Sequence, residues 1–142
     1  MMADVLTFVD AMPELPEVET VVRGLREPLI GRTVLSMWYD CDRTVKTPDP
    51  DQFAARIAGQ TFRSITRRAK YIVCELDHDL LVVHLKMTGR LYIVPDTAVN
   101  DGDRWVHFRL QLDGSQQLRF SDARKFGFVA LTDRLDAVTP LL

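Results

Sequence analysis

The sequence has 142 residues, 46% of them apolar and 27% charged, with a formal net charge of −2. This composition favours one folded domain over a disordered or fibrous chain. The net charge argues mildly against nucleic-acid binding, because neutralising phosphates supplies most of the affinity for nucleic acid. The longest apolar runs, such as residues 80–85, are far below the roughly 20 residues of a membrane span, and the first residues lack a basic start, so we expect a cytoplasmic protein without a membrane segment.

Two helices are predicted. Apolar residues recur at the spacing of one helix face soon after the chain's first prolines, at Val18, Val21, Val22, Leu25 and Leu29. Pro28 should distort the last turn of this helix, and Gly31 lies just past its end. A second, short helix is predicted over residues 50–58, with Asp49 as N-cap and Gly59 as terminator.

The rest of the chain reads as short strands, predicted at residues 33–39, 61–67, 71–76, 80–85, 91–94, 106–112, 117–120 and 126–131. The connections at 77–79 and 113–114 are too short for a crossover helix, so they indicate hairpins and antiparallel pairing. Residues 95–103 are expected to form a surface loop. The predicted fold is therefore mainly β with flanking helices, a two-sheet antiparallel β-sandwich plus two α-helices.

Basic residues gather in two places despite the negative net charge, at Arg67, Arg68 and Lys70 and at Arg119, Arg124 and Lys125. Such clusters usually mark a solvated face, although the distribution of charge says more about nucleic-acid binding than its sum does. Cys41 and Cys74 belong to no Cys-x-x-Cys pair and to no zinc-ligand spacing, so we expect free thiols and no metal site in this chain.

The segment 12–19, Met-Pro-Glu-Leu-Pro-Glu-Val-Glu, allows two interpretations. Two prolines and three acids are ordinary composition for a helix start. Alternatively, Met12 is the initiator and is trimmed, which leaves Pro13 with a free secondary amine of pKa near 8. Such an amine attacks a sugar C1′ to form a Schiff base, with Glu14 beside it to shuttle protons.

Three further segments accompany it: residues 67–71 (Arg-Arg-Ala-Lys-Tyr), 84–91 (His-Leu-Lys-Met-Thr-Gly-Arg-Leu) and 121–127 (Ser-Asp-Ala-Arg-Lys-Phe-Gly). With the segment at 12–19, in this order and at these separations, they resemble the formamidopyrimidine-DNA glycosylase family. The resemblance covers nearly the whole chain. Leu15 favours this branch over the related endonuclease VIII branch, which typically has Gly there and prefers oxidised pyrimidines.

The resemblance implies a set of site residues. The catalytic ones are Pro13 as Schiff-base nucleophile, Glu14 as proton donor, Glu17 as a supporting acid, and Lys70, which grips the DNA backbone and assists β-elimination. The DNA-binding ones are His84 and Lys125 at phosphates, His107 at a further contact, and Met87, Arg124 and Phe126, which enter the duplex when the damaged base is flipped out.

Without the family, several of these residues would be interpreted differently. A lysine at the start of a strand is usually a solvated charge, and a histidine at the end of an apolar strand is usually structural. Met87 and Phe126 would be assigned to the core.

The sequence departs from the family pattern in four places. Residues 1–11 are an extension that would leave the Pro13 nitrogen in an amide, so we expect a start assigned too early, or its removal. Residues 12–142 then form the N-terminal catalytic domain, and the helix–two-turns–helix segment and four-cysteine zinc finger that follow in the family lie beyond Leu142. This implies no cofactor in this chain. Trp105 replaces a DNA-contacting His, and Ala123 replaces a Pro.

The expected function is base-excision DNA repair by a bifunctional glycosylase and abasic-site lyase that removes oxidised purines such as 8-oxoguanine and formamidopyrimidine. The expected partner is double-stranded DNA containing these lesions or abasic sites, bound by a monomer near the nucleoid. Two alternatives stay open, namely a catalytically inactive domain that binds damaged DNA, and an endonuclease VIII-like activity on oxidised pyrimidines. An unrelated β-sandwich binding module is the remaining possibility.

Overall fold

The computed structural model describes residues 15–100 and 102–133. Its helices are α2 (Leu15–Leu29) and α3 (Pro50–Ile57), with short 3-10 turns at Asp42–Thr44, Asp103–Trp105 and Asp113–Ser115. Its strands are β1 (Val34–Tyr39), β2 (Val45–Thr47), β3 (Ser64–Arg68), β4 (Tyr71–Glu75), β5 (Leu80–His84), β6 (Arg90–Pro95), β7 (Val106–Leu112), β8 (Gln116–Ser121) and β9 (Phe128–Thr132).

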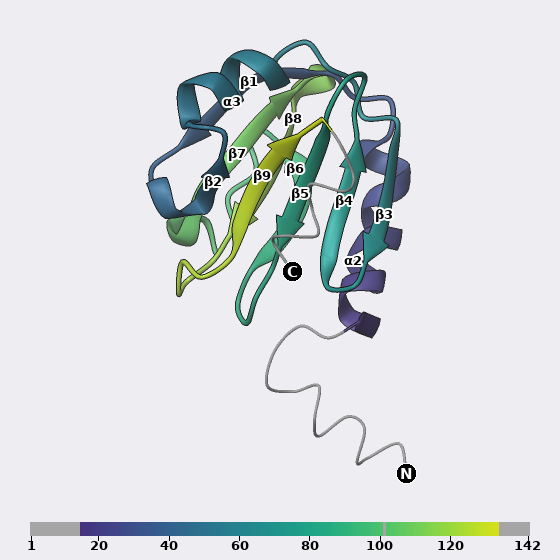
Figure 1. Ribbon diagram of the computed structural model, residues 1–142. Coiled ribbons are helices and arrows are strands. Elements are labelled where there is room, and N and C mark those ends of the chain that lie inside the picture. Colours follow the sequence, from purple (N-terminus) through teal and green to yellow (C-terminus); the bar gives the residue numbers. More distant parts are fainter. Residues whose placement is uncertain (1–14, 101, 134–142) are drawn as a thin grey trace.

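The strands form two sheets that pack face to face (Figure 1). One sheet has the order β1-β7-β8-β6, and the other has the order β2-β9-β5-β4-β3. Helix α2 contacts β3, β4 and β6 along one open side of the sandwich, and α3 contacts β1 and β2 along the other. The predicted β-sandwich with two helices is confirmed.

The core lies between the sheets and is closed by the apolar faces of both helices. Alternate residues of each strand point inward, and α2 adds Val18, Val22, Leu25 and Leu29, all buried. From α3, Phe53 meets Phe108 edge to face at a ring-centroid distance of 5.7 Å. The helix face read from the sequence is therefore the face that seals the sandwich.

Helix boundaries follow the predicted signals. Pro28 lies in the last turn of α2, which ends at Leu29, and Gly31 follows with a φ of +91°. Asp49 caps α3, because its carboxylate accepts a hydrogen bond from the Asp51 amide at 3.0 Å. Both predicted hairpins are confirmed as antiparallel connections, β4 to β5 and β7 to β8.

Three details differ from the prediction. Strand β2 was not expected, and it pairs with β9 in parallel, whereas every other strand pairing described is antiparallel. The strand predicted from residue 61 begins at Ser64, with Thr61 in a single bridge to Thr33. The strand predicted from residue 126 begins at Phe128, because the preceding residues turn sharply.

No helix within the described ranges is long and apolar enough to cross a membrane.

Candidate nucleic-acid interface

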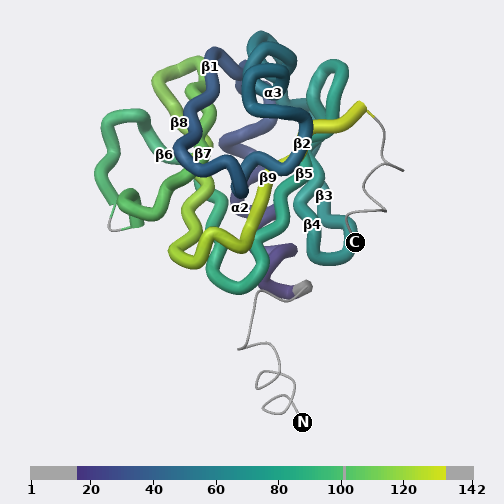
Figure 2. Tube along the Cα trace, turned by 60° about the vertical axis from the view of Figure 1, so that its left-hand side comes forward, coloured from purple at the N-terminus to yellow at the C-terminus, as the bar shows by residue number. Residues whose placement is uncertain are grey.

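Two of the motif segments lie side by side at one end of the sandwich. The loop between β5 and β6 carries residues 85–89, and the turn between β8 and β9 carries residues 122–127. Strands β5 and β9 are neighbours, and His84 pairs with Phe128, so both loops leave the sheet at the same level. Figures 1 and 2 show the two loops together at the end where α2 begins.

Asp122 joins these two loops. Its carboxylate, 1% exposed, accepts hydrogen bonds from the Thr88 hydroxyl of the first loop and from the amides of Arg124 (3.1 Å) and Gly127 (2.6 Å) in its own turn. The Asp122 amide donates to the Trp105 carbonyl at 2.9 Å. Because a buried carboxylate needs several donors, this arrangement fixes the position of each loop relative to the other.

Backbone geometry makes both loops sharp. Each contains a lysine with positive φ, Lys86 at +53° and Lys125 at +60°. A Cβ on Gly127 would lie 2.6 Å from Phe120 Cζ and 2.8 Å from the His84 carbonyl oxygen, so only glycine fits where the turn passes the end of β5.

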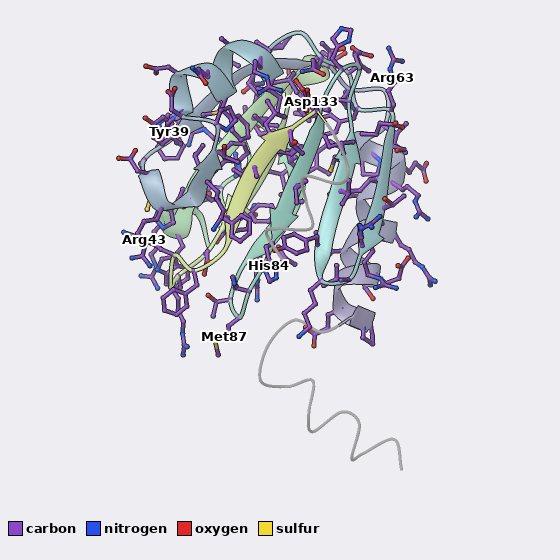
Figure 3. The ribbon with its side chains drawn as sticks, viewed as in Figure 1. Tyr39, Arg43, Arg63, His84, Met87 and Asp133 are labelled. Carbon is purple, nitrogen blue, oxygen red and sulfur yellow. The ribbon has the colours of Figure 1, made fainter. Side chains whose placement is uncertain are left out.

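Apolar side chains point outward from these loops. Met87 is 42% exposed and Phe126 is 49% exposed. Arg124 reaches across from the turn, with Nη1 3.8 Å from Met87 Sδ. Figure 3 shows Met87 projecting at the extreme end of the molecule. The core interpretation of Met87 and Phe126 is therefore wrong, and the geometry suits a wedge flanked by a cation.

We call the end formed by the two loops, residues 85–89 and 122–127, the tip. His84 lies beneath the tip, at the end of β5. Its ring stacks on Phe128 (centroids 5.6 Å apart) and meets Tyr71 edge to face at 4.6 Å. Nδ1 accepts a hydrogen bond from the Lys86 amide at 3.0 Å, which leaves Nε2 to carry the proton. Burial, together with the charges of Lys86 and Lys70, lowers the pKa of His84 to about 4. It is thus a neutral donor at physiological pH.

Lys70 and Glu17 are placed at the same end by different elements. Lys70 is half-buried in the turn between β3 and β4, after Ala69 with a φ of +53°. Arg67 ties this turn to α2, because its Nε lies 3.2 Å from a carboxylate oxygen of Glu19. Glu17 is exposed in the first turn of α2. Pro13 and Glu14 lie outside the described residues.

A cavity of about 820 Å³ opens beside Glu17. Its lining comes from α2, the loop after β5, β6 and the loop before β7, and it includes Glu17, Met87, Thr88, Tyr92, Asn100 and Gly102. Its volume is in the range of ligand pockets, and a carboxylate at its wall gives it an acid–base group.

The loop between β6 and β7 forms one wall of this cavity through Asn100 and Gly102, and Arg119 holds the loop in place. The guanidinium, 7% exposed, donates to the Ala98 carbonyl at 3.0 Å and pairs with Asp103 at 3.2 Å. Its Nε donates to Gln117 at 2.9 Å. Arg119, part of a predicted basic cluster, is therefore a buried support and not a surface charge.

His107 lies at the start of β7, at the same end of the sandwich as the two loops, but its side chain is buried. It is the extra residue of a β-bulge in β7, where Val106 and Phe108 pair with consecutive residues of β8. Its side chain is 7% exposed, Nδ1 lies 2.7 Å from Asp40, and Nε2 is buried with no hydrogen-bond partner among the described residues. Contact with DNA would require this side chain to move. Trp105, by contrast, is 36% exposed, with the Arg104 guanidinium 4.1 Å from its ring centroid.

Sequence reasoning gave no role to Asp122 or Thr88, although both lie inside quoted motifs. An acid in a turn is common, so only the three donors that converge on it reveal its role. Among the described residues, His, Cys, Asp and Glu side chains form no group of three or more able to hold a metal ion. Cys41 is half-buried and Cys74 is buried, and both are free thiols, as predicted.

Comparison with known proteins gives the same assignment by three routes. The sequence profile of the formamidopyrimidine-DNA glycosylase N-terminal domain matches residues 12–129. The formamidopyrimidine-DNA glycosylase of Chloroflexus aurantiacus is 47% identical over 89% of this chain and 47% of its own length, and that of Bacillus subtilis is 40% identical over 84% and 43%.

Solved structures agree. The Fpg of Lactococcus lactis, in a complex with DNA containing an abasic site, matches with a TM-score of 0.80 and 33% identity over 90% of this chain and 46% of its own. The same protein in a complex with FAPY-dG-containing DNA matches equally well, over 47% of its length. The chain spans about half the length of these relatives. It belongs to the formamidopyrimidine-DNA glycosylase family, as its N-terminal domain.

Proposed function

We propose that this chain supplies the catalytic half of a DNA glycosylase with abasic-site lyase activity that acts on oxidised purines in duplex DNA. Repair of damaged bases is the work of its family, and the relative from Lactococcus lactis has been solved with abasic-site and FAPY-dG DNA. The observation that carries the proposal is the tip itself, where exposed Met87 and Phe126 stand beside Arg124 and next to the cavity that holds Glu17.

The tip explains how a damaged base would be extruded. Removing a base from the stack costs a few kcal/mol, and an apolar side chain that fills the gap offsets part of that cost. Met87 and Phe126 supply the apolar surface, and Arg124 supplies hydrogen-bond donors for the orphaned base on the opposite strand. The coupling through Asp122 lets the wedge enter as one rigid unit.

The base-binding step uses the other side of the loop. Met87 and Thr88 belong both to the tip and to the cavity lining, so a base turned out past the wedge enters the cavity beside Glu17. Neutral His84 donates a hydrogen bond to the flanking phosphate through Nε2. The ammonium groups of Lys70 and Lys125 lie near the DNA backbone and neutralise part of its phosphate charge.

The chemistry runs through Pro13 once its nitrogen is free. The amine attacks C1′ and the bond from C1′ to the base breaks, with the departing base taking a proton that Glu14 supplies. The C1′–O4′ bond then breaks, O4′ takes up the proton that the amine releases, and the opened sugar is joined to Pro13 by an iminium at C1′. Loss of a C2′ proton then expels the 3′ phosphate, and water hydrolyses the iminium to return the amine.

Borohydride trapping tests this proposal, because hydride reduces the iminium to a stable amine. Chain beginning at Pro13 should form a covalent adduct with an 8-oxoguanine duplex, while chain that keeps Met12 should form none. Glu14→Gln in the Pro13 chain should slow adduct formation on 8-oxoguanine more than on a preformed abasic site, which needs no base loss.

The alternatives give different results. An adduct only with an oxidised pyrimidine would indicate the endonuclease VIII-like activity. Salt-sensitive binding to the lesion duplex without any adduct, including at a preformed abasic site, would refute the lyase and leave a damage-binding domain. Circular dichroism of each chain shows that the fold is intact.

A further inference from the structure

Beside the tip, a second group of positive charges lies on the outer face of the five-stranded sheet, around Phe128 at the start of β9. The Lys46 ammonium, from β2, lies 4.8 Å from the ring centroid of Phe128, and the Lys86 ammonium, from the loop after β5, lies 5.9 Å from the same centroid. His84 stacks on this ring as well. We name Lys46, Lys86, His84 and Phe128 the Phe128 cluster.

Neither lysine of the cluster is neutralised by a carboxylate of a described residue. Within the part of the chain that the structure describes, Lys46 and Lys86 form no ion pair with a carboxylate, whereas five arginines do, namely Arg23, Arg56, Arg63, Arg67 and Arg119. An aromatic face attracts a cation only weakly and leaves its donors unused. Both ammoniums thus have donors to offer to an added anion.

The histidine adds a donor without adding a charge. Because Nδ1 of His84 accepts from the Lys86 amide, its proton is on Nε2, and burial keeps the ring neutral. Two ammoniums and one neutral N–H around a single ring suit an extended anion with several acceptor oxygens. A nucleic-acid backbone is such an anion, with phosphates that recur about every 3.4 Å of helix axis on each strand.

The position of β2 brings Lys46 to this place. Strand β2 runs parallel to β9, with Val45 opposite Val129, so Lys46 lies next to the end of the sheet from which the two tip loops leave. None of the four motifs contains Lys46. We propose that Lys46 is a DNA-phosphate contact that, together with Lys86, extends the interface from the tip across β9 to β2.

This inference rests on the proposed function, since it concerns the same duplex. It is tested by measuring the dissociation constant of the whole chain for a duplex with a stable abasic-site analogue, at salt concentrations from about 25 to about 200 mM. The slope of log affinity against log salt counts the phosphates neutralised, at about 0.9 per phosphate.

Lys46→Gln should reduce the magnitude of that slope by about 1 and weaken binding about threefold to tenfold at the lowest salt. Lys46→Arg should keep the slope. The matched control is Arg63→Gln, which removes the same charge at the opposite end of the molecule from Met87 (Figure 3) and should leave the slope unchanged.

Each other outcome counts against the inference. If the unmodified chain binds with a clear salt dependence and Lys46→Gln has the same slope, Lys46 touches no phosphate, while the proposed function stands. Equal losses in Lys46→Gln and Arg63→Gln would show an effect of net charge alone. If the unmodified chain shows no salt-dependent binding at all, the DNA interface itself fails and Lys46 falls with it.

Discussion

Replacing Asp122 with Ala tests the link between the two tip loops most directly. The substitution removes the acceptor of three hydrogen bonds, from Thr88, Arg124 and Gly127. The Gly127 amide is buried, so leaving it without a partner costs about 2 kcal/mol. The other two donors are only partly buried and turn to water, at about 1 kcal/mol each. Asp122→Ala should therefore lower the free energy of unfolding by about 4 kcal/mol, a large part of the 5–15 kcal/mol typical of a domain.

Urea unfolding followed by circular dichroism measures this change. Asp122→Asn keeps one oxygen for the Gly127 amide and turns an NH₂ toward Thr88, whose hydroxyl then accepts, so its cost should be about half, near 2 kcal/mol. The matched control is Asp77→Ala. Asp77 also accepts from one amide and one side chain, Thr61 and Arg63, but in an exposed turn at the other end of the sandwich, so its loss should be much smaller.

A loss of less than about 1 kcal/mol in Asp122→Ala, or of no more than in Asp77→Ala, would mean that the two loops hold their positions without the Asp122 carboxylate. An equal loss of unfolding free energy in Asp122→Asn and Asp122→Ala would also contradict this link, since the oxygen that Asn keeps for the Gly127 amide would then contribute nothing.

Three further predictions concern single side chains. The pKa of His84 is lowered to about 4 in the folded protein, from 6.5 in the unfolded chain, so the stability that neutral His84 contributes is present above pH 6.5 and is lost as pH falls toward 4. His84→Gln should remove that part of the pH dependence of stability. An NMR titration midpoint near 6.5 in folded protein would show that burial does not lower this pKa. Burial raises the pKa of the Cys74 thiol to about 12, so a thiol reagent should label Cys41 in native protein and reach Cys74 only in urea. Equal labelling of Cys41→Ser in its native and urea-unfolded states would refute this. Met87→Ala and Phe126→Ala should each change the free energy of unfolding by less than about 0.5 kcal/mol, because both side chains are exposed. Each should lower the rate of base release from a lesion duplex at least about tenfold. A loss of stability with the rate of base release unchanged would assign these side chains a structural role.

The elements with regular patterns could be predicted from the sequence, and the irregular ones could not. The spacing of Val18, Val22 and Leu25 gives α2 directly, because burial against the sheets follows the helical period. Strand β2 was missed because three residues, one of them a lysine, carry no alternation. Its parallel pairing with β9 depends on a partner more than 80 residues away in the chain. Only the assembled sheet reveals that Lys46 is close to Phe128.

The site shows the same division. Periodicity and composition alone place Met87 and Phe126 in the core, and only the resemblance to a family moved them to the surface, where the structure has them. His107 is the reverse case, because a bulge, which no pattern in β7 announces, places its side chain inside. Asp122 was visible in its motif, yet its importance depends on a hydroxyl that arrives from another loop.

The way Arg119 holds the loop between β6 and β7 bears on how the cavity can vary. Three walls of the cavity come from α2, β6 and the loop after β5, whose positions the sheets dictate. The fourth is a surface loop that Arg119 holds through the Asp96 and Ala98 carbonyl groups and the Asp103 carboxylate, with further hydrogen bonds from Gln111 to the Asp96 carboxylate and from Ser121 to the Gly102 carbonyl. Residues can thus be exchanged, added or removed in this loop while the strands keep their register. The width of the cavity, and with it the bulk of the base that the proposed function would admit, should therefore depend on loop length, which natural variation or deliberate design can alter without rebuilding the domain.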